Sequence, residues 1–363
     1  MKNVLIIGPI PEPTTGVSLA NKVVLENLGK NAEYNLDSIN TSYNKFDEDL
    51  GAFSLSKFIF FLKLNFFAYK IFKADIVYIT PGQTFFGVVK YAVFIILSTV
   101  FGKDLITHIH GNHAGKEYSL LKGLKKRIFK LLLSKTSKGI VLSESLTGNM
   151  SPFIERKDIY VLYNFVEDYL FPAKEEIDQK IKLAKKPKVV FLSNLMQEKG
   201  IFDLLEALIL LEAEGFDYEA KIAGNIDAKH KQRVEDYFKK LKNVQYVGLV
   251  SGQEKKDLLL WGNVFVLPTF YKMEGQPISI LEAMATGNLI LTTKHAGIPD
   301  IFTENTNGFF VKKQDAIGLA ETIKATGLNY LACNKMRKHN FLYASKNYKV
   351  NNFINNFVRI IES

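Results

Sequence analysis

The chain has 363 residues, 47% of them hydrophobic, which is enough for two domains of ordinary size and excludes global disorder. Cys333 is the single cysteine, so an intrachain disulfide is excluded, and no Cys/His cluster has metal-ligand spacing. We therefore expect a globular cytoplasmic protein that needs no metal or other cofactor. The net charge of +10 favours an anionic partner, which could be nucleic acid, a membrane surface or a phosphorylated small molecule.

The first part of the chain alternates short β-branched runs with helical patterns, the first of which starts near Ser18. The apolar run at 4–7 is too short for a signal peptide. The stretch 84–102 approaches the length of a membrane span, but Lys90 lies inside it and strands flank it, so we interpret it as a buried crossover helix. Strands are predicted at 3–8, 74–82, 104–111, 138–144 and 158–164.

A second set of similar units begins near Lys188. Helices are predicted from Ile201, across 229–241, through Leu258 and from about 277. An amphipathic stretch at 351–362 follows this set. Strands are predicted at 189–194, 218–225, 244–248, 264–270 and 288–293.

This order of elements predicts an α/β protein made of two Rossmann-like parallel-sheet domains that face a central cleft. We place the N-terminal domain at 1–170, a charged linker at 171–187, the C-terminal domain at 188–335 and the last helices at 336–363. Ligands of such domains bind beyond the carboxyl ends of the strands, so the loops that follow strands are the candidate sites.

Two loops of the N-terminal domain are candidates. In "GPIPEPTTGVS", Gly8 and Gly16 would let backbone amides approach a phosphate or a sugar, or the loop is only a turn with Ser18 as helix cap. It is not a GxGxxG, which disfavours a nicotinamide cofactor. In "THIHGNH", His108 and His110 lie on the same side of an alternating strand end; a site role and a structural role remain equally open.

In the second domain, Lys199 and Gly200 come just before a predicted helix. A lysine beside unpaired helix amides is typical of a diphosphate site, although solvated lysines in such loops are common. Further along, "KMEGQPISILEAMATG" carries Glu274 and Glu282. The pattern "SILE" also fits a capping box with Ser279 as N-cap, which would make Glu282 structural, but a cap does not explain Glu274. A carboxylate there could accept hydrogen bonds from sugar hydroxyls or face developing positive charge.

Three other features of the sequence have both a functional and a purely structural interpretation. The "DED" at 47–49 resembles a metal-binding Asp-x-Asp motif, but no apolar strand precedes it and we interpret it as a solvated loop. The stretch 116–138 is predicted to be one basic amphipathic helix with an apolar stripe through Leu121, Leu124, Ile128 and Leu132. This helix and the aromatic-rich stretch 57–73 either contact a membrane or are core helices with snorkelling lysines.

Together these segments resemble glycosyltransferase family 4, whose members are nucleotide-sugar-dependent retaining enzymes of the GT-B fold. The resemblance is strongest over 188–311, where Glu274 and Glu282 match the family's Glu-x7-Glu signature, followed by a small-residue-rich helix and a strand. It implies a nucleoside diphosphate sugar as donor, with a UDP-sugar preferred, and a retained anomeric configuration. It also implies that the last helices return to the N-terminal domain.

The resemblance implies roles for individual residues. Glu274 would contact the transferred sugar, Glu282 the ribose hydroxyls and Lys199 the diphosphate. His110 would lie near the donor sugar, and Gly16 near the phosphates and the acceptor. The base would rest on the loop "GLVSG", which contains Val250, and the amides at the start of the signature helix would hold the diphosphate. The remaining donor-binding residues are then Asn194, Gly275, Gln276, Pro277 and Ile278.

The sequence departs from the family pattern in three places. Ser193 and Asn194 replace the usual Gly-Arg before the lysine, so one diphosphate-binding cation is missing. Gln276 and Pro277 stand where aromatic and glycine residues are common. "YNFVED" replaces the usual motif after the last N-terminal strand.

We therefore expect a metal-independent transferase that moves a sugar to a hydroxyl of a saccharide, with a lipid-linked acceptor at the cytoplasmic face of the membrane. The expected pathway class is capsule, exopolysaccharide or O-antigen assembly. An epimerase of the same fold and a non-catalytic sugar-nucleotide or membrane-binding protein remain as alternatives. Nucleic-acid binding is disfavoured because no recognised motif supports it.

Overall fold

The computed structural model describes residues 1–43 and 55–363, so the "DED" at 47–49 lies outside the described residues. Within the described part the chain forms two compact units. The first contains Met1–Asn164, Met273–Gln276 and Asn351–Ser363, and the second contains Phe165–Lys272 and Pro277–Val350. Each unit has a parallel sheet, which for the described residues has six strands, as the alternation of elements predicts.

The sheet of the first unit has the strand order β2-β1-β3-β4-β5-β6. Its strands β1, β3, β4 and β5 are buried runs of β-branched and leucine side chains, which is typical of a parallel sheet covered on both faces. The edge strand β2 was not predicted, because its sequence YNLDSIN is mostly polar. The strands are β1 (Lys2–Gly8), β2 (Tyr34–Asn40), β3 (Ile76–Ile79), β4 (Asp104–Ile109), β5 (Lys138–Val141) and β6 (Ile159–Val161).

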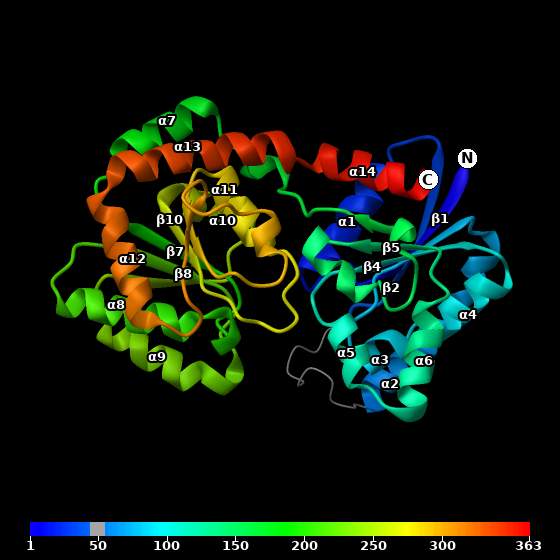
Figure 1. Ribbon diagram of the computed structural model, residues 1–363. Coiled ribbons are helices and arrows are strands. Elements are labelled where there is room, and N and C mark those ends of the chain that lie inside the picture. The colour runs from blue at the N-terminus through cyan, green and yellow to red at the C-terminus, as the bar shows by residue number, and fades with distance from the viewer. Residues whose placement is uncertain (44–54) are drawn as a thin grey trace. The chain divides into compact units, whose positions relative to one another are not determined.

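One face of this sheet packs against η1 (Asn65–Lys73), α4 (Ala92–Val100) and α6 (Gly123–Leu133), as the shared core of Leu5, Ile71, Phe94 and Phe129 shows. Figure 1 shows these elements on the same side of the sheet as α2 (Leu55–Leu64), α3 (Phe85–Val89) and α5 (Ala114–Leu120). The turns η2 (Glu144–Asn149) and η3 (Arg156–Asp158) follow β5 and precede β6.

The other face is covered by α1 (Gly16–Leu28) and α14 (Val350–Glu362). Phe357 of α14 makes an edge contact with Tyr78 of β3 at 5.1 Å between ring centroids, and Lys138 of β5 donates to the carbonyl of Ile361. Tyr34 of β2 donates to Glu362. The last helix therefore packs across strands β2, β3 and β5.

Helix α1 begins at Gly16, two residues before the predicted start near Ser18. Its N-cap is Thr15, whose side chain accepts from Ser18 N, and the Ser18 hydroxyl accepts from Thr15 N in return. Ser18 is thus the third residue of a capping box and not the cap itself. Such a cap stabilises a helix by about 1 kcal/mol, and it fixes the first turn at Gly16.

Two predicted helices of this unit are broken. The stretch 84–102 forms α3 and α4, and one side of α4 is exposed at Val93, Ile96 and Val100, so it is not a single buried helix. No helix of the described residues is long and apolar enough to cross a membrane. The basic stretch 116–138 divides into α5 and α6, because Lys122 is extended and Gly123 has φ +55°.

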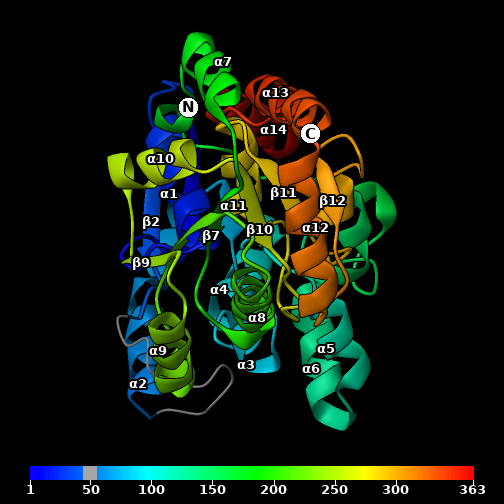
Figure 2. The ribbon, with the colours of Figure 1, turned by 90° about the vertical axis from the view of Figure 1, so that its left-hand side faces the viewer.

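The second unit has a sheet of order β12-β11-β10-β7-β8-β9. Helices α8, α9 and α12 cover one face, and α7, α10, α11 and α13 lie on the other, which is visible in Figures 1 and 2. The strands are β7 (Lys188–Leu192), β8 (Glu219–Ala223), β9 (Val244–Gly248), β10 (Val264–Leu267), β11 (Leu289–Thr292) and β12 (Gly308–Phe310).

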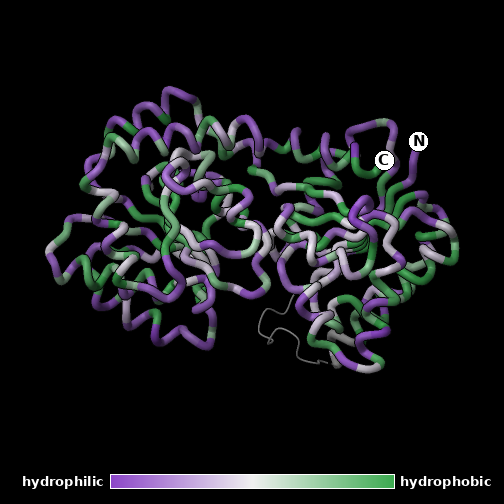
Figure 3. Tube along the Cα trace, viewed as in Figure 1, coloured by the Kyte–Doolittle hydropathy of each residue, from purple (hydrophilic) through white to green (hydrophobic). Residues whose placement is uncertain are grey.

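The helices of this unit surround a large core of Leu, Ile, Val and Phe side chains, and Figure 3 shows the strands largely in the hydrophobic colour. The predicted linker contains a helix, α7. The helices are α7 (Lys174–Leu183), α8 (Ile201–Ala213), α9 (Lys231–Lys240), α10 (Gly252–Trp261), α11 (Ile278–Ala285), α12 (Ala316–Leu328) and α13 (Tyr330–Asn347), with short turns η4 (Asp168–Leu170), η5 (Gln197–Lys199), η6 (Ala228–His230) and η7 (Ile298–Asp300).

Candidate functional site

The segment that carries Glu274 belongs to the first unit and is held there by its neighbours. Glu274 is 7% exposed. Asn164, just after β6, donates from its backbone N to Gln276 Oε1 (2.6 Å) and from Nδ2 to the Gln276 carbonyl (2.8 Å). Gln276 Nε2 donates to the carbonyl of Leu142, just after β5 (3.2 Å). Glu274 is thereby fixed at the carboxyl edge of the first sheet.

The same segment lies against the loop that follows β4. A Cβ on Gly275 would lie 2.9 Å from the His110 carbonyl O and 3.0 Å from Gly111 Cα. A Cβ on Gly111 would lie 2.5 Å from the Met273 carbonyl O. Only glycine permits so close an approach of two backbones. The structure therefore brings the backbones around His110 and Glu274 together, which the sequence alone does not show.

His108 and His110 lie on the same side of the strand end, as predicted. Their ring centroids are 3.8 Å apart, and Tyr78 OH lies 2.7 Å from His108 Nδ1. Among the described residues, neither Nε2 atom has a hydrogen-bond partner, although both are buried. Burial lowers the pKa of His110 to about 3, and burial and then the charge of His110 hold the pKa of His108 well below its usual value. Both rings are therefore neutral at pH 7.

In the second unit, Lys199 ends the turn η5 after β7. Gly200 has φ +80°, and a Cβ there would lie 2.6 Å from the Pro268 carbonyl O, so glycine is required at this position. The turn is tied to the loop after β10 because Phe270 N donates to the Glu198 carbonyl (2.7 Å). Lys199 Nζ lies 4.9 Å from the ring centroid of Tyr271. The lysine thus stands at the carboxyl edge of the second sheet, directly before α8.

Helix α11 begins two residues earlier than a capping box at Ser279 would require. Its N-cap is Pro277, which provides no side-chain cap, and Ile278 is its first residue. Ser279 therefore lies inside the helix and Glu282 in its second turn, so the capping-box alternative is wrong. Glu282 is 4% exposed.

Glu282 has an ion-pair partner that no sequence pattern indicates. Lys255 Nζ, on the first turn of α10, lies 2.6 Å from Glu282 Oε1 and 3.4 Å from Glu167 Oε2. Burial acts to lower the pKa of Lys255, but the charges of Glu282, Tyr169 and Glu167 outweigh it, and the pKa is raised. Lys255 is one of two adjacent lysines in an ordinary helical pattern, and nothing in the sequence distinguishes it from Lys256.

The other predicted donor residues lie at the following positions in the structure. Asn194 is exposed in the loop after β7, and Val250 packs at the edge of the core in the loop after β9. Pro277 is buried and Ile278 partly buried at the start of α11. Gly16 is the first residue of α1 in the first unit. Among the described residues no cluster of His, Cys, Asp or Glu is arranged to hold a metal ion.

The second unit matches a known family. Residues 173–341 match the model described as "Glycosyl transferases group 1". The chain is 29% identical over 156 residues to the amylovoran biosynthesis glycosyltransferase AmsK of Erwinia amylovora, which is 41% of this chain and 38% of AmsK. It is 25% identical over 134 residues to the capsular polysaccharide biosynthesis glycosyltransferase CapM of Staphylococcus aureus, which is 37% of this chain and 35% of CapM. The matches thus span little more than a third of these relatives.

The fold also matches solved structures. The crystal structure of HepE from Anabaena in complex with UDP has a TM-score of 0.75 to this chain at 16% identity, and the match covers 100% of both chains. At that identity the likeness shows the fold, which is GT-B. The second unit therefore matches the group 1 glycosyltransferases, family 4, and the whole chain has the GT-B fold.

Proposed function

We propose that this protein transfers a sugar from a nucleoside diphosphate sugar, most simply a UDP-sugar, to a hydroxyl of a saccharide in bacterial surface-polysaccharide biosynthesis, with retention of the anomeric configuration. The observation that carries the proposal is the placement of the Glu274 backbone against the His110–Gly111 loop, in a chain whose second unit matches the family. UDP is the ligand named for HepE, and AmsK and CapM are named for polysaccharide biosynthesis.

In this proposal the chain's own residues act on the charges that bond cleavage creates. Negative charge grows on the leaving diphosphate, where Lys199 and the first amides of α11 stabilise it. Positive charge grows on the sugar ring, where the Glu274 carboxylate stabilises it. Glu282 accepts from the ribose hydroxyls, and Val250 borders the base. His110, neutral at pH 7, hydrogen-bonds the sugar and does not act as a general acid.

The acceptor we propose is a saccharide linked to a lipid, and the protein docks on an anionic bilayer to reach it. The observation is a set of exposed apolar side chains on the face of the first unit formed by η1, α3, α4, α5 and α6, where α4 is largely green in Figure 3. Lys125 Nζ lies 6.0 Å from the ring centroid of Phe86. We define this docking face by Phe66, Phe72, Phe86, Ile96, Val100, Leu120, Leu124 and Leu131.

Charge supports a membrane as the occupant of the docking face. Helix α6 and its N-cap present exposed Lys122, Lys125, Arg127 and Lys130 beside Leu124 (71% exposed) and Leu131 (59%). Of the predicted apolar stripe, Leu124 is thus exposed, whereas Leu132 is buried. Apolar side chains among exposed cations are typical of a surface that binds anionic lipid, with about 1 kcal/mol per cation near the bilayer.

The test of activity measures nucleotide release from a panel of UDP-, GDP- and ADP-sugars, with and without a membrane lipid extract, with EDTA present. We expect release from one donor that rises with the extract and is lost in Glu274→Gln and Lys199→Ala. Lys240→Ala, on the exposed side of α9, is the matched control and should retain activity. Conversion of the donor sugar without nucleotide release would support an epimerase instead, and binding without turnover would overturn catalysis.

The test of docking is sedimentation with vesicles of phosphatidylcholine that contain either no anionic lipid or about a third phosphatidylglycerol. We expect binding only to the anionic vesicles, and weaker binding for Leu124→Ser and for Lys125→Gln. Leu210→Ser, an exposed leucine on α8 of the second unit, is the control. Equal binding of all three variants would exclude the docking face.

A further inference from the structure

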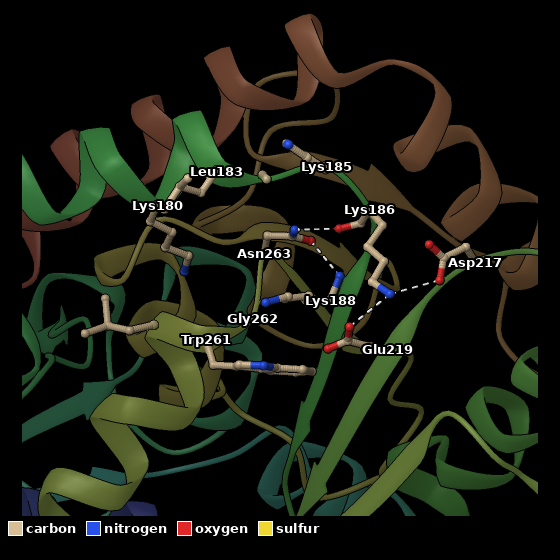
Figure 4. A pocket seen from close by; sticks show the side chains of 12 residues that line it. Lys180, Leu183, Lys185, Lys186, Lys188, Asp217, Glu219, Trp261, Gly262 and Asn263 are labelled. Atoms are coloured by element: carbon tan, nitrogen blue, oxygen red, sulfur yellow. Dashed lines mark hydrogen bonds and ion pairs between the residues drawn. The ribbon is translucent and has the colours of Figure 1, made fainter.

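A pocket of 530 Å³ lies in the second unit, and its lining does not include the proposed donor residues of that unit, which are Asn194, Lys199, Val250, Pro277, Ile278 and Glu282. Its lining includes Lys188 and Glu219, which are the first residues of β7 and β8, and Asn263, which lies just before β10. These are the amino ends of the strands, whereas Lys199 follows the carboxyl end of β7. Its volume falls in the range of small-molecule sites. Figure 4 shows the end of α7 above the pocket and the indole ring of Trp261 below Lys188.

The pocket holds more positive than negative charge. Lys186 is neutralised, since its Nζ lies 2.9 Å from both Asp217 and Glu219. Lys185 and Lys188 also line the pocket, and neither forms an ion pair with any residue in the described part of the chain. Cations that are gathered without carboxylate partners create a positive potential that an anion would relieve.

Two further cations lie deeper. Lys180 Nζ, at the pocket wall, donates to the carbonyls of Leu259 (2.9 Å) and Thr286 (2.6 Å) and to Asn288 Oδ1 (3.2 Å). Three acceptors require three N–H groups, which only the charged ammonium has. Burial, and then the charge of Arg337, hold the pKa of Lys180 well below its usual value, so a nearby anion would stabilise it.

Arg337 is the second of these cations and is fully buried. Its Nε donates to the carbonyl of Asn263, a residue of the pocket wall (2.9 Å), and its Nη2 is buried without a partner among the described residues. Neither Lys180 nor Arg337 pairs with a carboxylate in the part of the chain that is described. Buried charges normally have such a partner, so an anion bound in the pocket beside Lys180 would be favoured.

Trp261 adds a surface for a ring. Its indole is partly exposed at the pocket, and the ammonium groups of Lys188 and Lys221 lie 5.4 Å and 4.4 Å from its ring centroid. Lysine binds phosphate as a point charge, and an aromatic face packs against a sugar or base ring. The pocket therefore combines both parts of a recognition site for a phosphorylated ring compound.

We propose that the pocket bounded by Lys185, Lys188 and Trp261 is a second ligand site, separate from the donor site, which binds a small phosphorylated sugar or nucleotide with its phosphate on the lysines and its ring on the indole. Nothing in the proposed transfer reaction requires this pocket. Through this site, the concentration of a phosphorylated metabolite would influence the second unit from the edge of its sheet that lies opposite Lys199.

Trp261 is the only tryptophan of the chain, so its fluorescence reports on this pocket alone. The experiment titrates the full chain with glucose 6-phosphate and with inorganic phosphate, against sodium chloride at the same ionic strength. We expect a saturable change in emission with glucose 6-phosphate. Its dissociation constant should rise roughly tenfold in Lys188→Gln and in Lys185→Gln, and should be unchanged in Lys240→Gln.

A donor-site variant separates this proposal from the proposed function. In Lys199→Ala the emission change should persist, whether or not that variant transfers sugar. Because Lys188 itself lies over the indole, Lys185→Gln provides the independent check. The proposal is overturned if sodium chloride reproduces the change, if Lys199→Ala abolishes it, or if both pocket variants bind glucose 6-phosphate as tightly as the parent chain.

Discussion

Lys255 Nζ lies 2.6 Å from Glu282 Oε1, and both side chains are largely buried, at 14% and 5% exposure. Removal of the lysine would leave Glu282 and Glu167 as two carboxylates without their shared cation. We expect Lys255→Met to lower the free energy of unfolding by about 2–3 kcal/mol, because a charge left unpaired in a buried site is costly. Urea denaturation measures this directly.

The matched control is Lys256→Met on the same helix, which should change stability by less than about 0.5 kcal/mol. Glu282→Gln in the Lys255→Met background should recover part of the loss, with a coupling energy of about 1–2 kcal/mol in the double-mutant cycle. Additive effects of the two substitutions would show that the pair has no energetic role.

Asn194 stands where the family usually has arginine, and it is exposed, so a larger side chain fits. We expect Asn194→Arg to tighten UDP binding roughly threefold to tenfold at low salt, because a guanidinium forms charge-assisted hydrogen bonds with phosphate. The gain should shrink at about 0.5 M salt. Calorimetric titration measures both. Asn243→Arg, at the opposite edge of the sheet, should bind UDP as the parent does; equal gains in both variants would indicate only a general charge effect.

His110 should make stability depend on pH. Its pKa is about 3 in the folded chain and about 6.5 when unfolded, so the unfolded state binds more protons between these values. The stabilisation is complete above pH 6.5 and is lost as the pH falls below it. Between pH 7.5 and pH 5 the free energy of unfolding should fall less in His110→Gln than in the parent chain, by up to about 2 kcal/mol. Urea denaturation at both pH values tests this, and an unchanged difference would mean that His110 is not buried as a neutral ring.

Gly111 should tolerate no side chain. A Cβ there would lie 2.1 Å from Gln83 Nε2 and 2.5 Å from the Met273 carbonyl O, so Gly111→Ala must move the backbone next to Glu274. We expect stability to fall by about 1–3 kcal/mol and turnover to fall at least about tenfold. Gly148→Ala, whose Cβ would meet nothing within 4 Å, is the control. Steady-state kinetics of both variants measure the turnover. Normal turnover in Gly111→Ala would contradict the placement of Glu274.

The sequence predicted the buried strands well, because runs such as Val4–Ile7 have one interpretation in a parallel sheet. It missed β2, an edge strand with alternating polar residues, and β12, which has only three residues. It also treated 116–138 as one helix, since hydrophobic spacing continues past Gly123 although the backbone there takes φ +55°.

Candidate site residues were predicted only where a motif exists. Lys199 and Glu282 were proposed from local patterns, but the contacts of Glu282 with Lys255 and of Gly275 with the His110 loop join residues far apart in the chain. No local rule connects such positions. The capping-box alternative failed for a related reason: "SILE" satisfies the spacing, but the N-cap is Pro277, two residues before Ser279.

Helix α14 packs on the sheet formed by residues near the beginning of the chain, with Phe357 on Tyr78. During synthesis the ribosome must therefore complete the whole second unit before the first can cover that face. Domains commonly fold in the order in which they emerge, but here the order is reversed for the last step. The part of this sheet face that α14 covers in the folded chain therefore stays exposed in the nascent first unit throughout that interval, and chaperones bind exposed hydrophobic surface of this kind.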